Sequence, residues 1–302
     1  MRAPESFRWL RRGRREVFGG CGWRDAGGRS AAGRTLGIVA TTEQGVTTAR
    51  VSVGGTELYL LTGGSGPPML VLHGMEGHEG WLAFHAALAG RATVVAPSHP
   101  GFGQTECPAW LSTIQHQAVF YNWYLQSAGF DAVDLVGIGV GGWIAAQMAV
   151  MCQTALRHLV LVDAAGIRPE RAEILDVFVT PWKQVLDQAF SDPHSAPEYA
   201  RIYGGGIAEF GGSREAGRTM SMRMCFRPFM YDPALPGMLG TVQVPTLIVW
   251  GKEDRIVPLE CAQQYQRAIP GATVRLLDRC GHFAHFEQPR LLADTINEFI
   301  AP

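Results

Sequence analysis

The residues of this chain that can do acid–base or nucleophilic chemistry stand in short segments that directly follow apolar runs. An apolar run that ends in such a segment is typical of a buried strand in a parallel sheet, and ligands bind at the carboxyl ends of such strands. A histidine oriented by a carboxylate at this edge can transfer protons near neutral pH. The segments are His73–Gly77, Pro97–Gly103, Gly137–Gly142, Asp163–Gly166, Gly251–Pro258 and Asp278–Pro289.

The cysteines and histidines do not have the spacing of a metal site. The six cysteines are scattered without a C-x-x-C pair, which also argues against a disulfide framework and predicts a reducing, cytoplasmic location. Four histidines in the amino-terminal and carboxyl-terminal parts are equally dispersed: His73, His78, His99 and His285. We therefore expect neither a metal nor another cofactor.

One segment has the local pattern of a nucleophile-bearing turn. Val133–Ile138 is an apolar run, Gly137–Gly142 is a glycine-rich turn, and Trp143–Val150 is an apolar helical stretch. This is the context of the G-x-S-x-G motif, in which a serine stands on a strained turn between strand and helix. Here the middle position is Gly139, so serine, cysteine and alkyl-enzyme mechanisms are excluded at this position.

The order of the apolar runs predicts the architecture. Strand-like and helix-like runs alternate, which favours a parallel sheet of about eight strands with helices on both faces. The alternation stops over residues 167–240, where aromatic and methionine residues accumulate, and we expect a helical cap there. The predicted domain thus spans 48–302, with its core at 48–166 and 241–302.

Residues 1–47 differ from the rest of the chain. They are rich in arginine and glycine and have no sustained periodicity, so we expect a disordered extension. The formal net charge of the whole chain is −1, which argues against nucleic-acid binding. No apolar run reaches the ~20 residues of a membrane span, so the expected partner is a small molecule in solution.

Four motifs together resemble those of the α/β-hydrolase superfamily, in its capped branch. His73-Gly74 is similar to the oxyanion-loop motif, and Pro97–Gly103 to the loop after the next strand. Gly251–Pro258 resembles the loop with the catalytic acid, and Gly281–Pro289 the loop with the catalytic histidine. The resemblance implies an α/β-hydrolase fold, a mostly parallel eight-stranded sheet with a helical cap insertion.

The resemblance also implies roles for individual residues. His282 matches the base and Asp254 the acid of the triad, although Asp163 is an alternative partner for His282. The backbone N–H groups of Val140 and Met75 match the oxyanion donors. The substrate pocket is expected to include residues of the oxyanion loop and two tryptophans: His73, Gly74, Glu76, Trp143 and Trp182.

Two function classes stay open. In the first, the protein is a hydrolase of a small ester, lactone, amide or C–C substrate, in which His282 and Asp254 activate water without a serine nucleophile. Its rate should then rise with pH near the ordinary histidine value of ~6.5. In the second, it is a catalytically inactive relative of such enzymes that binds a small molecule.

Overall fold

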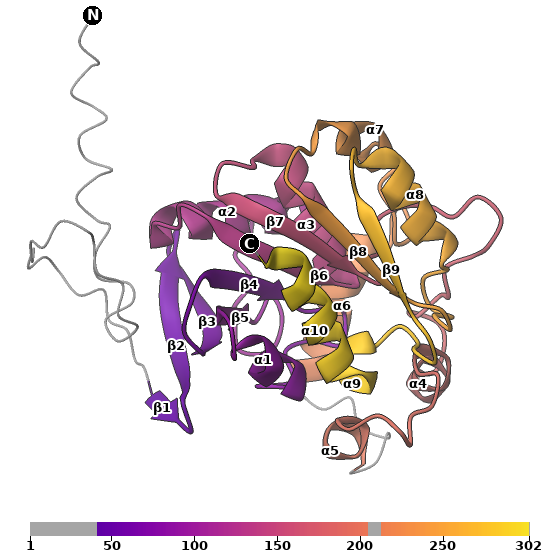
Figure 1. Cartoon of the computed structure of the whole chain (residues 1–302), viewed down its shortest axis with the longest axis horizontal. Helices are drawn as coiled ribbons and strands as arrows, with labels where there is room; N and C mark the ends of the chain where they lie inside the picture. The colour runs from indigo at the N-terminus through magenta and orange to yellow at the C-terminus, as the bar shows by residue number, and fades with distance from the viewer. Residues whose placement is uncertain (1–40, 205–212, 302) are drawn as a thin grey trace, which may run out of the picture.

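A single mixed sheet forms the centre of the protein. The computed structural model describes residues 41–204 and 213–301 (Figure 1). The nine strands run in the order β1-β2-β3-β5-β4-β6-β7-β8-β9, and every pairing from β5 to β9 is parallel. The mostly parallel α/β architecture is therefore confirmed, with nine strands rather than eight. The strands are β1 Thr41–Glu43, β2 Val46–Val53, β3 Thr56–Gly63, β4 Pro68–Leu72, β5 Thr93–Pro97, β6 Val133–Ile138, β7 Leu156–Val162, β8 Thr246–Gly251 and β9 Thr273–Leu277.

The antiparallel strands lie at the amino-terminal edge of the sheet. β2 and β3 form a hairpin through Gly54 and Gly55, whose φ angles of 57° and 85° favour glycine. The ring of Trp123 fills the place of a side chain at Gly54. Residues 41–47, which the sequence assigned to the extension, instead form β1 and the start of β2. Because β1 is polar and exposed, it has no apolar pattern that marks it as a strand.

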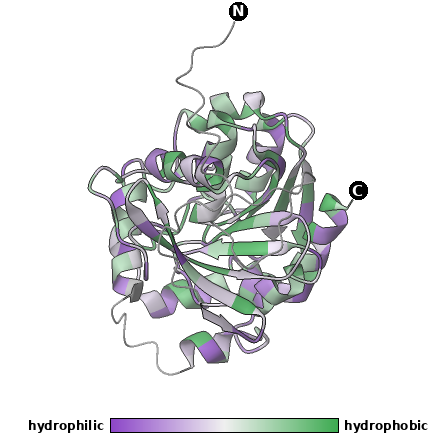
Figure 2. Ribbon diagram, turned by 90° about the vertical axis from the view of Figure 1, so that its left-hand side faces the viewer, coloured by the Kyte–Doolittle hydropathy of each residue, from purple (hydrophilic) through white to green (hydrophobic). Residues whose placement is uncertain are grey.

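Helices cover the two faces of the sheet. On the near face in Figure 1, α1 (Ala83–Leu88) packs beside α10 (Pro289–Ile300), although the two are far apart in sequence. On the other face α2 (Ile114–Ala128) packs against α3 (Val140–Met151), and α8 (Glu260–Ala268) covers β8 and β9. The central strands are mostly green in Figure 2, and hydrophilic purple segments lie on the surrounding helices and turns. The apolar core thus lies between sheet and helices.

The regular elements between β7 and β8 are all helices where the structure describes this segment. Its only pairing with β-geometry is an isolated bridge between Gly166 and Tyr231, so the described part of this segment adds no strand to the sheet. The Phe190 ring meets the Phe283 ring edge-on at 5.4 Å and ties the segment to the core. Its elements are α4 Trp182–Ala189, α5 Tyr199–Tyr203, α6 Ser213–Cys225, α7 Leu235–Met238 and η2 Leu239–Thr241.

Two further expectations concern the surroundings of the domain. The predicted disorder of the amino-terminal extension falls on residues 1–40, which lie outside the described residues. Within the described ranges, none of the helices combines the length and apolar character that crossing a bilayer requires.

Candidate active site

The turn between β6 and α3 places Gly139 at the carboxyl edge of the sheet. Gly139 has φ 53° and ψ −115°, a conformation that glycine adopts at little cost and other residues rarely adopt. Its N–H donates to the Val162 carbonyl at 2.9 Å, and its carbonyl accepts from Ala165 at 3.0 Å. A Cβ atom at this position would lie 3.3 Å from His282 Nε2 and 3.7 Å from Gly74 Cα. A side chain here would therefore stand directly against the histidine.

His282 and Asp254 form a buried hydrogen-bonded pair. His282 Nδ1 lies 2.8 Å from Asp254 Oδ2, while Asp254 Oδ1 accepts from the backbone N–H groups of Ile256 and Val257. These backbone bonds fix the carboxylate, which in turn orients the ring so that Nε2 faces Gly139. Burial lowers the pKa of His282, but the charge and hydrogen bond of Asp254, helped by the charge of Glu76, outweigh burial and raise this pKa above 6.5.

The alternative acid, Asp163, does not pair with His282. Its Oδ1 accepts from the Gly251 N–H at 2.8 Å, and its side chain is fully buried. Burial and the nearby charge of Asp254 raise the pKa of Asp163 well above its usual value. The structure therefore resolves the choice that the sequence left open.

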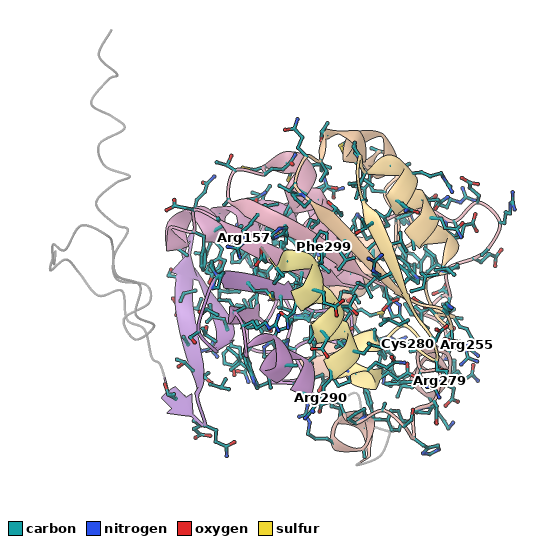
Figure 3. The ribbon with its side chains drawn as sticks, viewed as in Figure 1. Arg157, Arg255, Arg279, Cys280, Arg290 and Phe299 are labelled. Carbon is teal, nitrogen blue, oxygen red and sulfur yellow. The ribbon has the colours of Figure 1, made fainter. Side chains whose placement is uncertain are left out.

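The loops that hold the pair lie at one end of the sheet. Arg255, next to Asp254, and Cys280, two residues before His282, are labelled close together in Figure 3, where β8 and β9 end. The Cys280 N–H donates to the Glu253 carboxylate at 2.9 Å, and the Glu253 N–H donates to the Cys280 carbonyl at 3.0 Å. These reciprocal bonds join the two loops and hold acid and base in register.

Two backbone N–H groups lie beside Gly139. Val140 is the first residue of α3, so its N–H has no acceptor within the helix. Met75 follows Gly74, and the hydrogen bonds of the described residues use neither N–H as a donor. His73 fixes this loop, because its Nδ1 contacts the Gly74 carbonyl at 2.7 Å and its Nε2 accepts from His99 N–H at 3.0 Å. Burial lowers the pKa of His73 well below 6.5, so its ring is neutral.

A second acid–histidine pair lies behind the same loop. Glu76 Oε1 accepts from the Gly74 N–H at 2.9 Å and lies 3.3 Å from His285 Nε2. Both side chains are 2% exposed. Burial raises the pKa of Glu76, but the hydrogen bond and charge of His285, with smaller contributions from His73 and a backbone hydrogen bond, together outweigh burial and lower this pKa below its usual value. The sequence pointed to Glu76 but not to His285, to which no motif gave a role in the site.

A small cavity adjoins this second pair. Its volume is about 10 Å³, close to the space that one water molecule needs. His73 and Glu76 line it together with His78, His85 and His285. No spacing pattern in the sequence joins these histidines, because they come from a loop, α1 and the short helix α9 (Ala284–Glu287).

The two predicted pocket tryptophans lie elsewhere. Trp143 is buried on α3, and its ring occupies the place of a side chain at Gly166. Trp182 is half-buried at the start of α4. Neither lines this small cavity, because α3 turns Trp143 toward the loop after β7. In the same described ranges, no group of three or more histidine, cysteine or acidic residues could hold a metal ion.

Relatives in sequence include enzymes that hydrolyse small molecules. The 2-hydroxy-6-oxo-2,4-heptadienoate hydrolase of Pseudomonas putida is 28% identical over 269 residues, which cover 83% of this chain and 95% of that protein. An uncharacterized protein of Mycobacterium tuberculosis is 27% identical over 261 residues, or 78% of this chain and 76% of that protein.

Solved structures share the fold. A membrane phospholipase A, described as a bacterial virulence factor, superimposes with a TM-score of 0.74 at 26% identity, covering 85% of this chain and 86% of its own. A mutant of the meta-cleavage product hydrolase CumD gives a TM-score of 0.71 at 24% identity, covering 83% and 96%. The profile of the Alpha/beta hydrolase family matches residues 69–295. The chain therefore belongs to the alpha/beta hydrolase family.

Proposed function

We propose that this protein hydrolyses a small carbonyl substrate with a water molecule that His282 and Asp254 activate, without a covalent intermediate. The substrate is an ester, lactone, amide or a ketone with a cleavable C–C bond. One observation supports this most: His282 Nε2, oriented by Asp254, faces Gly139 at the place where a side chain would stand. Gly139 thus takes the position that holds the nucleophile in serine enzymes of this fold.

The proposed reaction uses groups that already surround Gly139. His282 Nε2 takes one proton from water while the water oxygen bonds to the substrate carbonyl carbon. The N–H groups of Val140 and Met75 stabilise the oxyanion that forms. Collapse of this tetrahedral intermediate breaks the bond to the leaving group, which receives the proton from His282. Asp254 stabilises the imidazolium between these two steps.

The relatives support the substrate class. The Pseudomonas putida relative is named for a hydroxy-oxo-dienoate, a small molecule with a ketone carbonyl. Because general-base catalysis alone supplies about 10²–10⁴-fold, we expect slow turnover, or turnover of activated substrates. The raised pKa of His282 moves the expected rise of the rate to a pH above the ordinary histidine value.

Labelling with a fluorophosphonate tests the role assigned to Gly139. The wild-type protein should not react at this turn, whereas Gly139→Ser should become labelled at position 139, because the added oxygen would lie within reach of His282 Nε2. Gly139→Ala is the matched control, since it adds the same Cβ and the same backbone strain without an oxygen. Labelling of wild type at another serine, with loss of its hydrolysis, would contradict the proposal.

A binding protein without activity is the second candidate. The observation that favours it is the relaxed turn, because glycine at φ 53° removes the strain that a nucleophile imposes. On this alternative, His282→Ala would leave ligand affinity unchanged and no substrate panel would show turnover above the buffer rate.

A further inference from the structure

Glu76 brings a carboxylate to the space beside Gly139. The Glu76 Oε2 atom fills the place of a side chain at Gly74, since a Cβ built there would lie 2.3 Å from it. The same Gly74 Cα lies 3.7 Å from the Cβ position of Gly139. Glu76 also acts on His282 through its charge. The carboxylate is therefore close enough to influence a substrate at the proposed site.

Glu76 keeps a carboxylate in this place. Its Oε1 accepts from the Gly74 N–H at 2.9 Å and lies 3.3 Å from His285 Nε2. The pKa of Glu76 lies below the usual value of a glutamate, so the side chain is ionised near pH 7.

No permanent cation lines the cavity beside Glu76 in the described chain. The residues that line the cavity include Glu79 but neither lysine nor arginine. Burial lowers the pKa values of His73, His78, His85 and His99, which favours their neutral forms near pH 7. His282 must also be neutral to take a proton from water. In its reactive state the site then holds two carboxylates, Glu76 and Asp254, and no permanent cation.

We propose that Glu76 is a specificity-determining residue that makes the site reject carboxylate substrates and accept uncharged or cationic ones. This rests on the proposed hydrolytic site and names the charge class of its substrate. Like charges that share a water-poor site repel strongly, because the effective dielectric is low. The expected substrate therefore differs in charge from the dienoates for which some relatives are named.

The test compares two substrates that differ only in charge. 3-(Acetylthio)propanoate and 3-(acetylthio)propanamide have the same shape, and thiol release reports the kcat/KM of each. Wild type should prefer the amide by about tenfold or more, a ratio equivalent to about 1.4 kcal/mol. Glu76→Gln keeps an oxygen for the Gly74 N–H and should bring the ratio close to one. Glu57→Gln, which removes an exposed carboxylate on β3, should leave the wild-type ratio unchanged.

The ratio is independent of how much protein is active, so partial unfolding of a variant does not change it. Equal ratios for wild type and Glu76→Gln would overturn the proposal. Binding of the matching thioethers, in which CH₂ replaces the carbonyl group, is measured by calorimetry as a second readout. If the thioethers show the same charge preference and its loss in Glu76→Gln while no thioester turns over, charge selection stands and the hydrolytic function fails. If wild type prefers the amide neither in thioester turnover nor in thioether binding, the proposed role of Glu76 in charge selection is wrong, whether or not the protein hydrolyses thioesters.

Discussion

Buried carboxylates have different hydrogen-bonding partners at the two ends of the central strands. At the amino ends of β6 and β7, Asp134 is 1% exposed and accepts from Arg157 Nε at 2.8 Å and from a second Arg157 nitrogen. His158 Nδ1 lies 2.8 Å from the same carboxylate, and its ring packs against Phe299. Arg157 and Phe299 are labelled at this end in Figure 3. Both oxygens of Asp134 therefore have close partners, and one of these partners, Arg157, is a permanent cation.

At the carboxyl ends, Asp254 and Glu76 have a histidine as their side-chain partner in the described chain. Asp254 contacts His282, and Glu76 contacts His285. Each of these histidines leaves one ring nitrogen without a partner among the hydrogen bonds of the described residues. A fully paired cluster contributes stability, whereas a partly paired one keeps groups free for a substrate. The difference is consistent with the proposed site at the carboxyl edge and with a structural role for the amino edge.

Loss of the Asp134 carboxylate should give the largest change in stability. Asp134→Ala leaves Arg157 and His158 without their acceptor, and breaking a buried pair costs about 3 kcal/mol at the low end of the usual range, which suits the partly exposed Arg157. The melting temperature should fall by roughly 6–12 °C for a chain of this size. The kcat/KM of the folded fraction should stay unchanged. If Asp134→Ala instead lowered activity and left the melting temperature unchanged, the structural role assigned to the amino edge would be wrong.

The corresponding change at the carboxyl edge should affect activity instead. Asp254→Asn keeps the shape of the side chain but removes the charge that orients and stabilises the His282 imidazolium. Hydrolysis should fall by about 10²-fold or more, within the range of general-base catalysis. Calorimetry should show a smaller change in melting temperature than for Asp134→Ala. A variant with wild-type turnover would exclude Asp254 from the reaction.

The pH dependence sharpens the comparison further. The hydrolysis rate should rise with pH with a midpoint above ~6.5, because Asp254 and Glu76 raise the pKa of His282. Glu76→Gln should lower the midpoint, and Asp254→Asn should lower it more. Because the pKa of His282 is higher in the folded than in the unfolded protein, protonation of this residue stabilises the fold at pH values below its unfolded pKa. This contribution to the free energy of unfolding is lost as pH rises through the folded pKa. A midpoint that is unaffected by both variants would show that another group controls the rate.

The smallest effect is expected from the amino-terminal extension. Its arginine- and glycine-rich composition without periodicity predicts that it adds no core packing. Deletion of residues 1–40, which keeps β1, should leave the melting temperature within about one or two degrees of the full-length value. A drop of many degrees would show that the extension docks on the domain.

The sequence predicted the features that depend on local pattern. Apolar runs such as Val133–Ile138 marked the buried parallel strands, and their order gave the architecture. The motif at Gly251–Pro258 pointed to Asp254, which the structure places against His282. The exposed edge strand β1 was missed, because its three residues are polar and have no buried face. Hydrophobic patterns along the sequence reveal strands that bury a face, and all three residues of β1 are exposed.

The features that depend on packing between distant segments could not be predicted in this way. The contact between Glu76 and His285 joins residues from a loop and from α9, and no spacing in the sequence links them. The family resemblance placed Trp143 in the expected pocket, but α3 directs its ring toward Gly166. Side-chain direction is set by the helix and its neighbours, which sequence position alone does not specify.

The most direct test of the account is the turnover of a panel of small uncharged esters, lactones and thioesters by wild type and His282→Ala. His158→Ala is the matched control, since it removes a histidine from the amino edge. The account predicts turnover above the buffer rate in wild type and in His158→Ala, and the buffer rate alone in correctly folded His282→Ala. Equal turnover in wild type and His282→Ala would contradict it.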